Sequence, residues 1–250
     1  MLMLSFIVIS IANLLVILTS QSQAFTLHRI SINDWPPFRI SFDTSLHGRT
    51  KNEEEASLSL LDEVYYKTLT LKDLPSLYRL TLNEFGPLES SNQDKIHLGW
   101  RVLSLFTPKL ASPNIMGHKV IGLIKKTSRS LVGFIDLSLQ PSCGTIAALD
   151  NSPLRIRMWI YGNDSLRPYI CNLLVAAPFR RQGLGKLLIN ACETEALNMG
   201  YSDVFLHVEE SCISALSLYT NQQFVVEKKL SGAGLLFMRK QLAKEVLINH

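Results

Sequence analysis

The segment from Tyr169 to Val208 constrains the fold more than any other part of the chain. An apolar run, YICNLLV (169–175), leads into the glycine turn FRRQGLGK (179–186), and leucines and alanines then recur at helical spacing until Gly200. The next run, DVFLHV, alternates between two faces as a half-buried strand does. Two strands joined by a crossover helix lie parallel in one sheet. The sequence therefore predicts a domain of the α/β class.

The rest of the chain adds strands and helices that periodicity, caps and turn residues predict. In chain order we expect a strand at 64–71, helices at 72–86 and 94–106, a hairpin of strands at 118–126 and 130–141, a short helix at 213–222, and strands at 224–230 and 234–242. Residues 141–167 contain prolines, scattered polar residues and no clean period, so they predict a long loop. This order predicts a mixed α/β domain with one parallel strand pair.

The first 60 residues differ in composition from the remainder. Residues 2–18 are uncharged and apolar apart from Ser5, Ser10 and Asn13, and the following TSQSQAF places small residues at Ser22 and Ala24, as a signal peptidase site does. Residues 25–51 are rich in Ser, Thr and Arg and poor in acidic residues, which is transit-peptide composition. A signal segment followed by such a stretch looks like the bipartite leader of plastid proteins in algae with secondary plastids. A plain secretory signal and an uncleaved membrane anchor are the alternatives. The predicted segments are a signal-like 1–24, a transit-like or linker 25–60 and a folded domain at 61–245.

Charge and cysteine usage exclude several classes of protein. The net charge is only +4, from 25 Lys and Arg against 21 Asp and Glu, so there is no strong electrostatic case for nucleic-acid binding. The four cysteines lie 20 or more residues apart, with no C-x-x-C pair and no histidine at ligand spacing; they are Cys143, Cys171, Cys192 and Cys212. We therefore expect free thiols, no disulfide framework and no metal.

The glycine turn fits an anion site but neither of two common nucleotide motifs. One residue separates Gly183 from Gly185 and Leu187 follows the lysine, whereas a Walker loop needs four residues and a Ser or Thr. A dinucleotide fingerprint would need a glycine where Leu188 stands. A helix that begins at such a turn still directs backbone N–H groups and the positive end of its dipole outward. The turn therefore predicts a diphosphate site, with a solvated basic helix start as the alternative.

The pattern R-x-x-G-x-G, preceded by NLLVAAP and followed some thirty residues later by ALSLYTNQQF, resembles the GCN5-related N-acetyltransferase superfamily over about residues 64–242. The resemblance implies the acyl-CoA N-acyltransferase fold, a mainly antiparallel sheet with a splayed parallel strand pair and flanking helices. It also implies acetyl-CoA as co-substrate and direct attack by an amine in a ternary complex. The cofactor contacts it implies are Leu173, Leu174, Val175, Arg180, Arg181, Gln182, Gly183, Leu184, Gly185, Lys186, Cys212 and Tyr219.

The same resemblance implies three catalytic residues. Tyr219 matches the tyrosine that lies near the departing sulfur, where a phenol of pKa about 10 can protonate a thiolate. YICNLLVAAPFRRQGLG together with LHVEES is similar to catalytic subunits of protein N-terminal acetyltransferases, in which a tyrosine and a histidine act through a water. The matching residues are Tyr169 and His207, with Glu209 and Glu210 as less favoured bases. Core roles for Tyr219 and His207 are the alternatives.

The resemblance predicts an enzyme that acetylates a protein or peptide amine, either an N-terminal α-amine or a lysine. An acetyltransferase for a small amine, such as a polyamine or amino sugar, is the alternative substrate class. Two departures from the family pattern, Cys212 in place of Asn and Gln223 in place of Gly, leave open a non-catalytic acetyl-CoA-binding regulatory module. A membrane partner is expected only if the N-terminal hydrophobic segment is retained.

Overall fold

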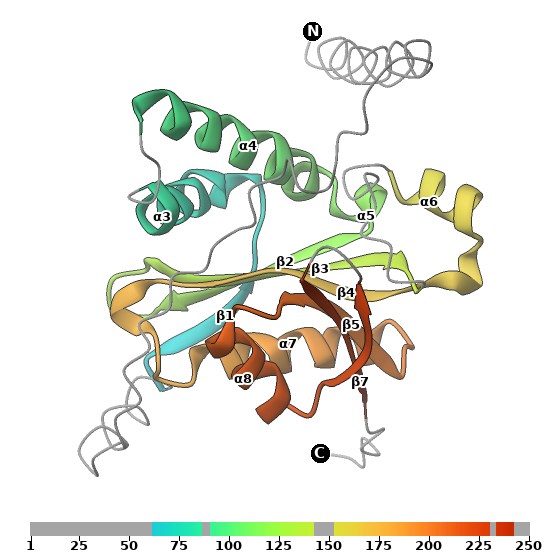
Figure 1. Cartoon of the computed structure of the whole chain (residues 1–250). Coiled ribbons are helices and arrows are strands. Elements are labelled where there is room, and N and C mark those ends of the chain that lie inside the picture. The colour runs from blue at the N-terminus through green and yellow to red at the C-terminus, as the bar shows by residue number, and fades with distance from the viewer. Residues whose placement is uncertain (1–61, 87–90, 143–152, 231–233, 243–250) are drawn as a thin grey trace, which may run out of the picture. The chain divides into compact units, whose positions relative to one another are not determined.

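The computed structural model describes residues 62–86, 91–142, 153–230 and 234–242, all within the compact unit Phe42–His250. These residues form one seven-stranded sheet with helices on both faces (Figure 1). The strands are β1 (Val64–Thr68), β2 (His118–Lys125), β3 (Leu131–Pro141), β4 (Leu166–Val175), β5 (Asp203–Glu209), β6 (Val225–Leu230) and β7 (Leu235–Gln241). The α-helices are α3 (Leu74–Phe85), α4 (Asn92–Ala111), α5 (Pro113–Met116), α6 (Leu154–Tyr161), α7 (Leu184–Asn198) and α8 (Ile213–Asn221). Short 3-10 helices are η2 (Leu71–Asp73), η4 (Asn163–Ser165) and η5 (Ala177–Phe179).

The strand order across the sheet is β1-β2-β3-β4-β5-β7-β6. Neighbouring strands are antiparallel except β4 and β5, which are parallel and joined by the crossover helix α7. The predicted class, a mainly antiparallel sheet with one parallel pair, is confirmed. The predicted edge strand at the start of the domain and the β2–β3 hairpin are confirmed as well.

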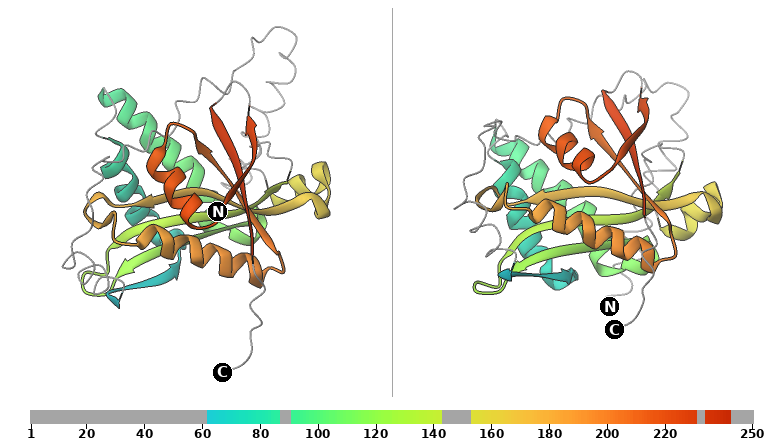
Figure 2. Two further views of the ribbon diagram at one scale, coloured as in Figure 1. Left: turned by 60° about the horizontal axis from the view of Figure 1, so that its bottom comes forward. Right: turned by 90° about the horizontal axis from the view of Figure 1, so that it is seen from below.

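The parallel pair separates soon after it begins. The ladder between β4 and β5 consists of the pairs Tyr169↔Phe205 and Ile170↔Leu206. Directly beyond it the register of β3 against β4 shifts, so that Asp136 faces both Cys171 and Asn172. Such a bulge bends a strand and increases its twist. The C-terminal part of β4 therefore stays with β3 while β5 diverges, and Figure 2 shows the orange and red strands leaving the yellow and green ones at a wide angle. We call the divergent halves the β4–β5 split.

Alternation along the strands sends side chains to two cores, one on each face of the sheet. On one face α7 and α8 cover an apolar cluster that includes Leu123, Ile135, Leu188, Ile189 and Leu206. On the other face α3 and α4 cover a second apolar cluster, which includes Leu77, Leu98, Val102, Phe106 and Phe134. Figure 1 shows α5 and α6 on the same face as α4, toward the start of β4. The predicted two faces of β5 are confirmed, because Val204, Leu206 and Val208 belong to the α7 core.

The prediction that residues 141–167 form a continuous loop is wrong, because they include α6 and the start of β4. Three apolar residues of α6 face outward: Ile156, Trp159 and Ile160 are 38%, 85% and 47% exposed. The fully buried residue of the helix is Arg157, which is 0% exposed, and Leu154 is half-buried. A charged side chain therefore lies where the usual amphipathic pattern would place an apolar one.

The prediction that the second helix ends before Pro108 is also wrong, because α4 continues through that proline to Ala111. A proline inside a helix removes one hydrogen bond and crowds the preceding turn. Here it lies in the last turn, which also carries the buried Lys109 and Leu110. Burial of these two side chains offsets the local cost, and Pro108 C=O still accepts a hydrogen bond from Ser112 N–H at 3.0 Å.

None of the helices within the described ranges combines the length and the apolar character that crossing a membrane requires. The predicted signal-like segment at 1–24 and the transit-like segment at 25–60 lie outside the described residues.

Candidate functional site

The end of β4 presents one backbone edge to the β4–β5 split. Leu173, Leu174 and Val175 pair with β3 on one side, and the ladder with β5 has already ended at Ile170. Among the described residues no strand pairs with the opposite edge of this stretch. Backbone N–H and C=O groups are obligatory hydrogen-bonding groups, so this edge can accept an extended ligand as an added strand.

The glycine turn begins α7 with backbone N–H groups that point away from the helix. Gly183 precedes the helix with φ +85°, and Arg181 also has a positive φ of +62°. The first intrahelical bond runs from Leu187 N–H to Gly183 C=O at 3.1 Å. The N–H groups of residues 184–186 therefore have no acceptor within the helix. This is the anion-binding geometry that the sequence predicts for the turn.

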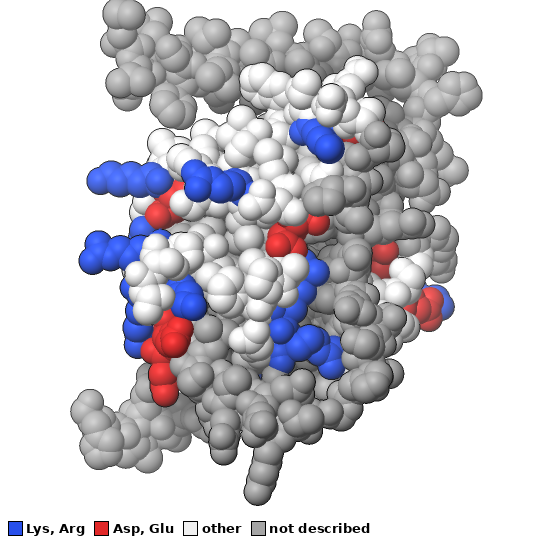
Figure 3. Space-filling model, turned by 90° about the vertical axis from the view of Figure 1, so that its left-hand side faces the viewer, with Lys and Arg blue, Asp and Glu red and all other residues white. Residues whose placement is uncertain are grey.

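The three cations of the turn have different surroundings. Arg180 Nε donates to Val175 C=O at 2.9 Å, and its guanidinium pairs with Glu84 of α3, which also accepts from Ala177 N–H at 2.9 Å. Arg180 thus fastens the turn to α3, and its charge is matched. The side chains of Arg181 and Lys186 are exposed. Lys and Arg side chains gather on the face of the molecule near the start of α7 (Figure 3).

Tyr219 lies on α8, on the α7 side of the sheet. Its side chain is buried, and its ring meets Phe224 edge-on at 5.7 Å between centroids. Burial raises the pKa of the Tyr219 phenol well above its ordinary value near 10, with smaller effects from Cys212 and Cys192. The phenol therefore stays protonated at neutral pH and can act as a proton donor.

Gly185 allows α8 to approach the start of α7. A Cβ atom at this position would lie 3.1 Å from Cδ2 of Leu218, the residue before Tyr219. That distance is tighter than an ordinary van der Waals contact, so a larger residue would require the Leu218 side chain to shift. The absence of a side chain at Gly185 therefore allows Leu218 of α8 to pack against the start of α7.

The two positions that depart from the family pattern flank α8. Burial raises the pKa of the Cys212 thiol, so the sulfur is protonated at neutral pH and not a thiolate nucleophile. Gln223 adopts φ +67°, a left-handed conformation in which a non-glycine residue is strained. Gln223 therefore occupies a turn whose backbone conformation favours glycine.

Tyr169 and His207 come together on the opposite face of β5 from Tyr219. Their ring centroids are 5.4 Å apart, and His207 also contacts Phe237 at 5.0 Å. The Tyr169 hydroxyl is buried and has no hydrogen-bond partner among the described residues. Since such a group costs about 1–3 kcal/mol when unsatisfied, it favours a water or a ligand polar group beside it. Glu210, the less favoured base, forms an exposed ion pair with Lys229 at 2.6 Å.

A buried charge cluster, which the sequence analysis missed, lies beside this pair. Asp136 on β3 accepts from Lys109 Nζ at 2.7 Å, His118 Nδ1 at 3.1 Å and Asn172 Nδ2 at 3.3 Å. His118 Nε2 in turn lies 3.4 Å from Arg157 Nη1. We call these five residues the Asp136 cluster. The available signal was an aspartate in the middle of the apolar strand LVGFIDLSL, because a buried carboxylate requires partners.

The Asp136 carboxylate is nevertheless not a candidate base. Burial alone would raise its pKa, but Lys109 and His118 hold the pKa of Asp136 far below its ordinary range. The carboxylate therefore remains ionised at neutral pH and has little tendency to take a proton from an amine. The role of Asp136 is therefore structural and does not involve proton transfer.

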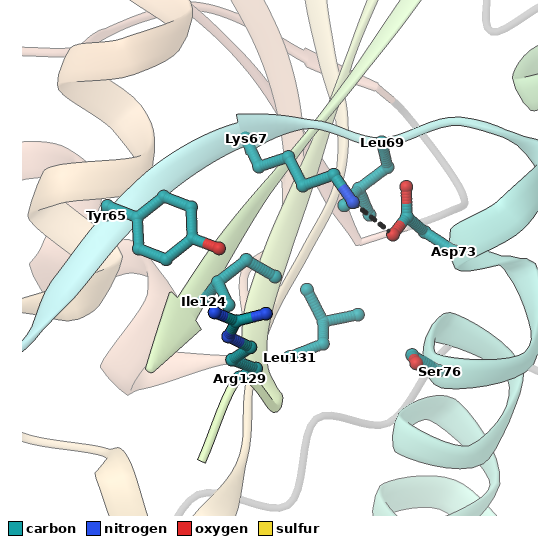
Figure 4. A pocket seen from close by; sticks show the side chains of 8 residues that line it. All are labelled: Tyr65, Lys67, Leu69, Asp73, Ser76, Ile124, Arg129 and Leu131. Atoms are coloured by element: carbon teal, nitrogen blue, oxygen red, sulfur yellow. Dashed lines mark hydrogen bonds and ion pairs between the residues drawn. The ribbon is translucent and has the colours of Figure 1, made fainter. Parts of the chain in front are cut away.

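A cavity of about 250 Å³ lies elsewhere, between β1, the β2–β3 hairpin and α3. Its lining includes Lys67, Asp73 and Arg129, and Lys67 Nζ bonds Asp73 Oδ1 at 2.5 Å (Figure 4). None of the predicted site residues lines this cavity. We therefore assign the candidate site to the β4–β5 split and the glycine turn, where the predicted residues converge.

The chain is similar to known proteins in sequence and in fold. Residues 117–224 match the acetyltransferase (GNAT) family. In fold the chain is similar to PH1933 from Pyrococcus horikoshii OT3, with 18% identity over 72% of this chain and 99% of that chain and a TM-score of 0.50. It is also similar to the PaiA N-acetyltransferase from Thermoplasma acidophilum in complex with coenzyme A, with 16% identity over 71% and 98% of the two chains and a TM-score of 0.49. No curated protein matches the chain in sequence.

Proposed function

We propose that this chain transfers acetyl from acetyl-CoA to an amine of a protein or peptide, because residues 117–224 match the acetyltransferase (GNAT) family. The observation that carries this proposal is the contact between Tyr169 and His207, 5.4 Å between ring centroids, where β4 and β5 are still paired. These are the residues that resemble the catalytic pair of protein N-terminal acetyltransferases. Their position at the closed end of the β4–β5 split supports a role in receiving the amine.

The residues around the split fit coenzyme A. The N–H groups of residues 184–186 suit a diphosphate, and the exposed cations Arg181 and Lys186 add favourable charge. The free edge of Leu173–Val175 suits the amide-containing arm of the cofactor. A backbone N–H from this edge could also donate to the thioester oxygen, and one such donor is typically worth about 3 kcal/mol in the transition state.

The reaction requires two proton transfers, one from the attacking amine and one to the departing thiolate. At pH 7, deprotonating an α-amine costs about 1 kcal/mol, whereas deprotonating a lysine costs about 4.6 kcal/mol. His207 and Tyr169, acting through a water, would take this proton, since histidine is suited to proton transfer near neutral pH. On the other face of β5, the protonated Tyr219 would donate to the departing thiolate.

The first experiment tests both acetyl transfer and the role of Tyr219. The full chain is incubated with acetyl-CoA and peptides that carry either a free or a blocked N-terminus, and products are identified by mass spectrometry. Tyr219→Phe should lower kcat by about 10² because it removes the proton donor. Tyr65→Phe on the exposed face of β1 is the matched control and should turn over normally. Normal turnover by Tyr219→Phe would remove the phenol from the mechanism.

Competition between acceptors separates the substrate classes. Peptides should be acetylated in preference to a polyamine or an amino sugar present at equal concentration. Acetylation of the small amines alone would show that the proposed acceptor is wrong. Binding of acetyl-CoA without transfer to any amine would instead favour a regulatory module.

A further inference from the structure

The position of Asp136 is tied to the β4 bulge. Asp136 is the single β3 residue that faces two β4 residues, Cys171 and Asn172. The bulge begins one residue beyond Ile170, the last residue of β4 that pairs with β5. The cluster therefore lies at the point where the two parallel strands separate.

Asn172 is the cluster member that belongs to the bulge. Its Nδ2 donates to Asp136 Oδ2 at 3.3 Å. The same oxygen accepts from Lys109 of α4 at 2.7 Å, and the other oxygen accepts from His118 of β2 at 3.1 Å. Because Asp136 is 0% exposed and held from two further elements, the Asn172 side chain is fastened to a fixed point.

The cluster continues from Asp136 to α6. His118 Nδ1 lies 3.1 Å from Asp136 Oδ1, and His118 Nε2 lies 3.4 Å from Arg157 Nη1. Arg157 Nη2 also donates to Met116 C=O. The bulge is thus linked through Asp136 and His118 to α6.

Stability alone does not account for this arrangement. Removing charges from water costs several kcal/mol per ion, and apolar residues of similar volume are often at least as stabilising as a buried ion pair. The hydrogen bonds of the cluster are directional, so in addition to any stability they fix the position of the Asn172 side chain. A bulge without an anchor could shift along β4 or realign that strand with β5.

We infer that Asp136 and Asn172 are positioning residues, whose hydrogen bond holds the β4 bulge and thereby keeps the β4–β5 split open for coenzyme A. This inference rests on the proposed function only in the identity of the ligand. It assigns no proton transfer to either residue. It predicts that loss of the Asn172 amide weakens cofactor binding more than it slows acetyl transfer.

The test compares Asn172→Ala with Asn190→Ala, the same deletion on α7, in the full chain. Calorimetry with coenzyme A should show affinity about tenfold weaker for Asn172→Ala, the effect of one lost hydrogen bond, and unchanged affinity for Asn190→Ala. In the acetylation assay the KM for acetyl-CoA should rise while kcat stays within about threefold of the unaltered protein. Unchanged coenzyme A affinity in Asn172→Ala would overturn the inference.

Hydrogen exchange in the absence of ligand tests the bulge itself. Amides of residues 172–174 should exchange faster in Asn172→Ala than in the unaltered protein, and those of residues 169–170 should exchange at the same rate. Equal exchange at residues 172–174 would contradict the inference even if affinity fell. A protein that binds coenzyme A but acetylates nothing would refute the proposed function and leave this inference standing.

Discussion

Two regions on opposite faces of the sheet are held by different physics. One is the apolar core under α7, which we call the apolar face; the other is the charged cluster where α4, α5 and α6 meet, which we call the charged face and which adjoins the apolar core under α3 and α4. Under α7 the fully buried side chains are apolar, among them Leu184, Leu188 and Ile189. On the opposite face, where α4, α5 and α6 meet, two of the largest fully buried side chains are Lys109 and Arg157. Apolar burial is non-directional and tolerates rearrangement, whereas a buried charge is stable only with its partners in place. The apolar face should therefore tolerate rearrangement, whereas the charged face requires each partner to be in place.

Asp136→Asn should produce the largest loss of stability, because it leaves Lys109 buried without its carboxylate. We expect the free energy of unfolding to fall by about 3–5 kcal/mol, measured by urea titration with circular dichroism. Asp136→Leu combined with Lys109→Met should recover most of that loss, since it removes both charges. A loss below about 1 kcal/mol in the single variant would mean that this face does not depend on the ion pair.

Leu188→Ala breaks the apolar face at a residue that is 0% exposed. We expect a loss of about 3 kcal/mol from the lost transfer energy and the cavity left behind, in the same urea titration. Leu188→Met, which conserves volume, is the control and should cost less than about 1.5 kcal/mol. If both variants were equally damaging, packing on the apolar face would be as exacting as on the charged one.

Acid should weaken the charged face but not the apolar one. The folded-state pKa of Asp136 is depressed, so its contribution to stability is complete above the unfolded pKa near 3.9 and is lost as pH falls below it. Between pH 5 and pH 3 the unaltered protein should lose up to about 1.4 kcal/mol per pH unit more than the Asp136→Leu, Lys109→Met variant. Leu188→Ala, with the cluster intact, should follow the slope of the unaltered protein. If the free energy of unfolding fell with the same slope against pH in all three proteins, the distinction between the charged and the apolar face would be refuted.

The difference between apolar burial and buried charge also explains which parts of the fold could be predicted from the sequence. The alternation of β5, the helical period of α7 and the glycine turn are local patterns, and all three were located correctly. The α6 helix was missed because its inward residue is Arg157, so hydropathy pointed the wrong way. The partners Lys109 and Asp136 are 27 residues apart in sequence, beyond the reach of any local period.

The candidate site also has residues that could be found from the sequence and contacts that could not. The family resemblance selected Tyr169 and His207, and their rings are adjacent in the structure. The pairing of Arg180 with Glu84, 96 residues earlier, could not be inferred, because nothing in the local sequence links α3 to the glycine turn. The predicted catalytic and cofactor roles remain predictions, and Tyr219→Phe tests one of them.

The outward orientation of Trp159 affects what tryptophan fluorescence can report about this protein. The two tryptophans within the described residues, Trp100 and Trp159, are 67% and 85% exposed. Their fluorescence emission is therefore already close to that of an unfolded chain, and it reports poorly on either core. The same property makes Trp159 a sensitive optical probe of whatever approaches α6, through quenching or a blue shift of its emission.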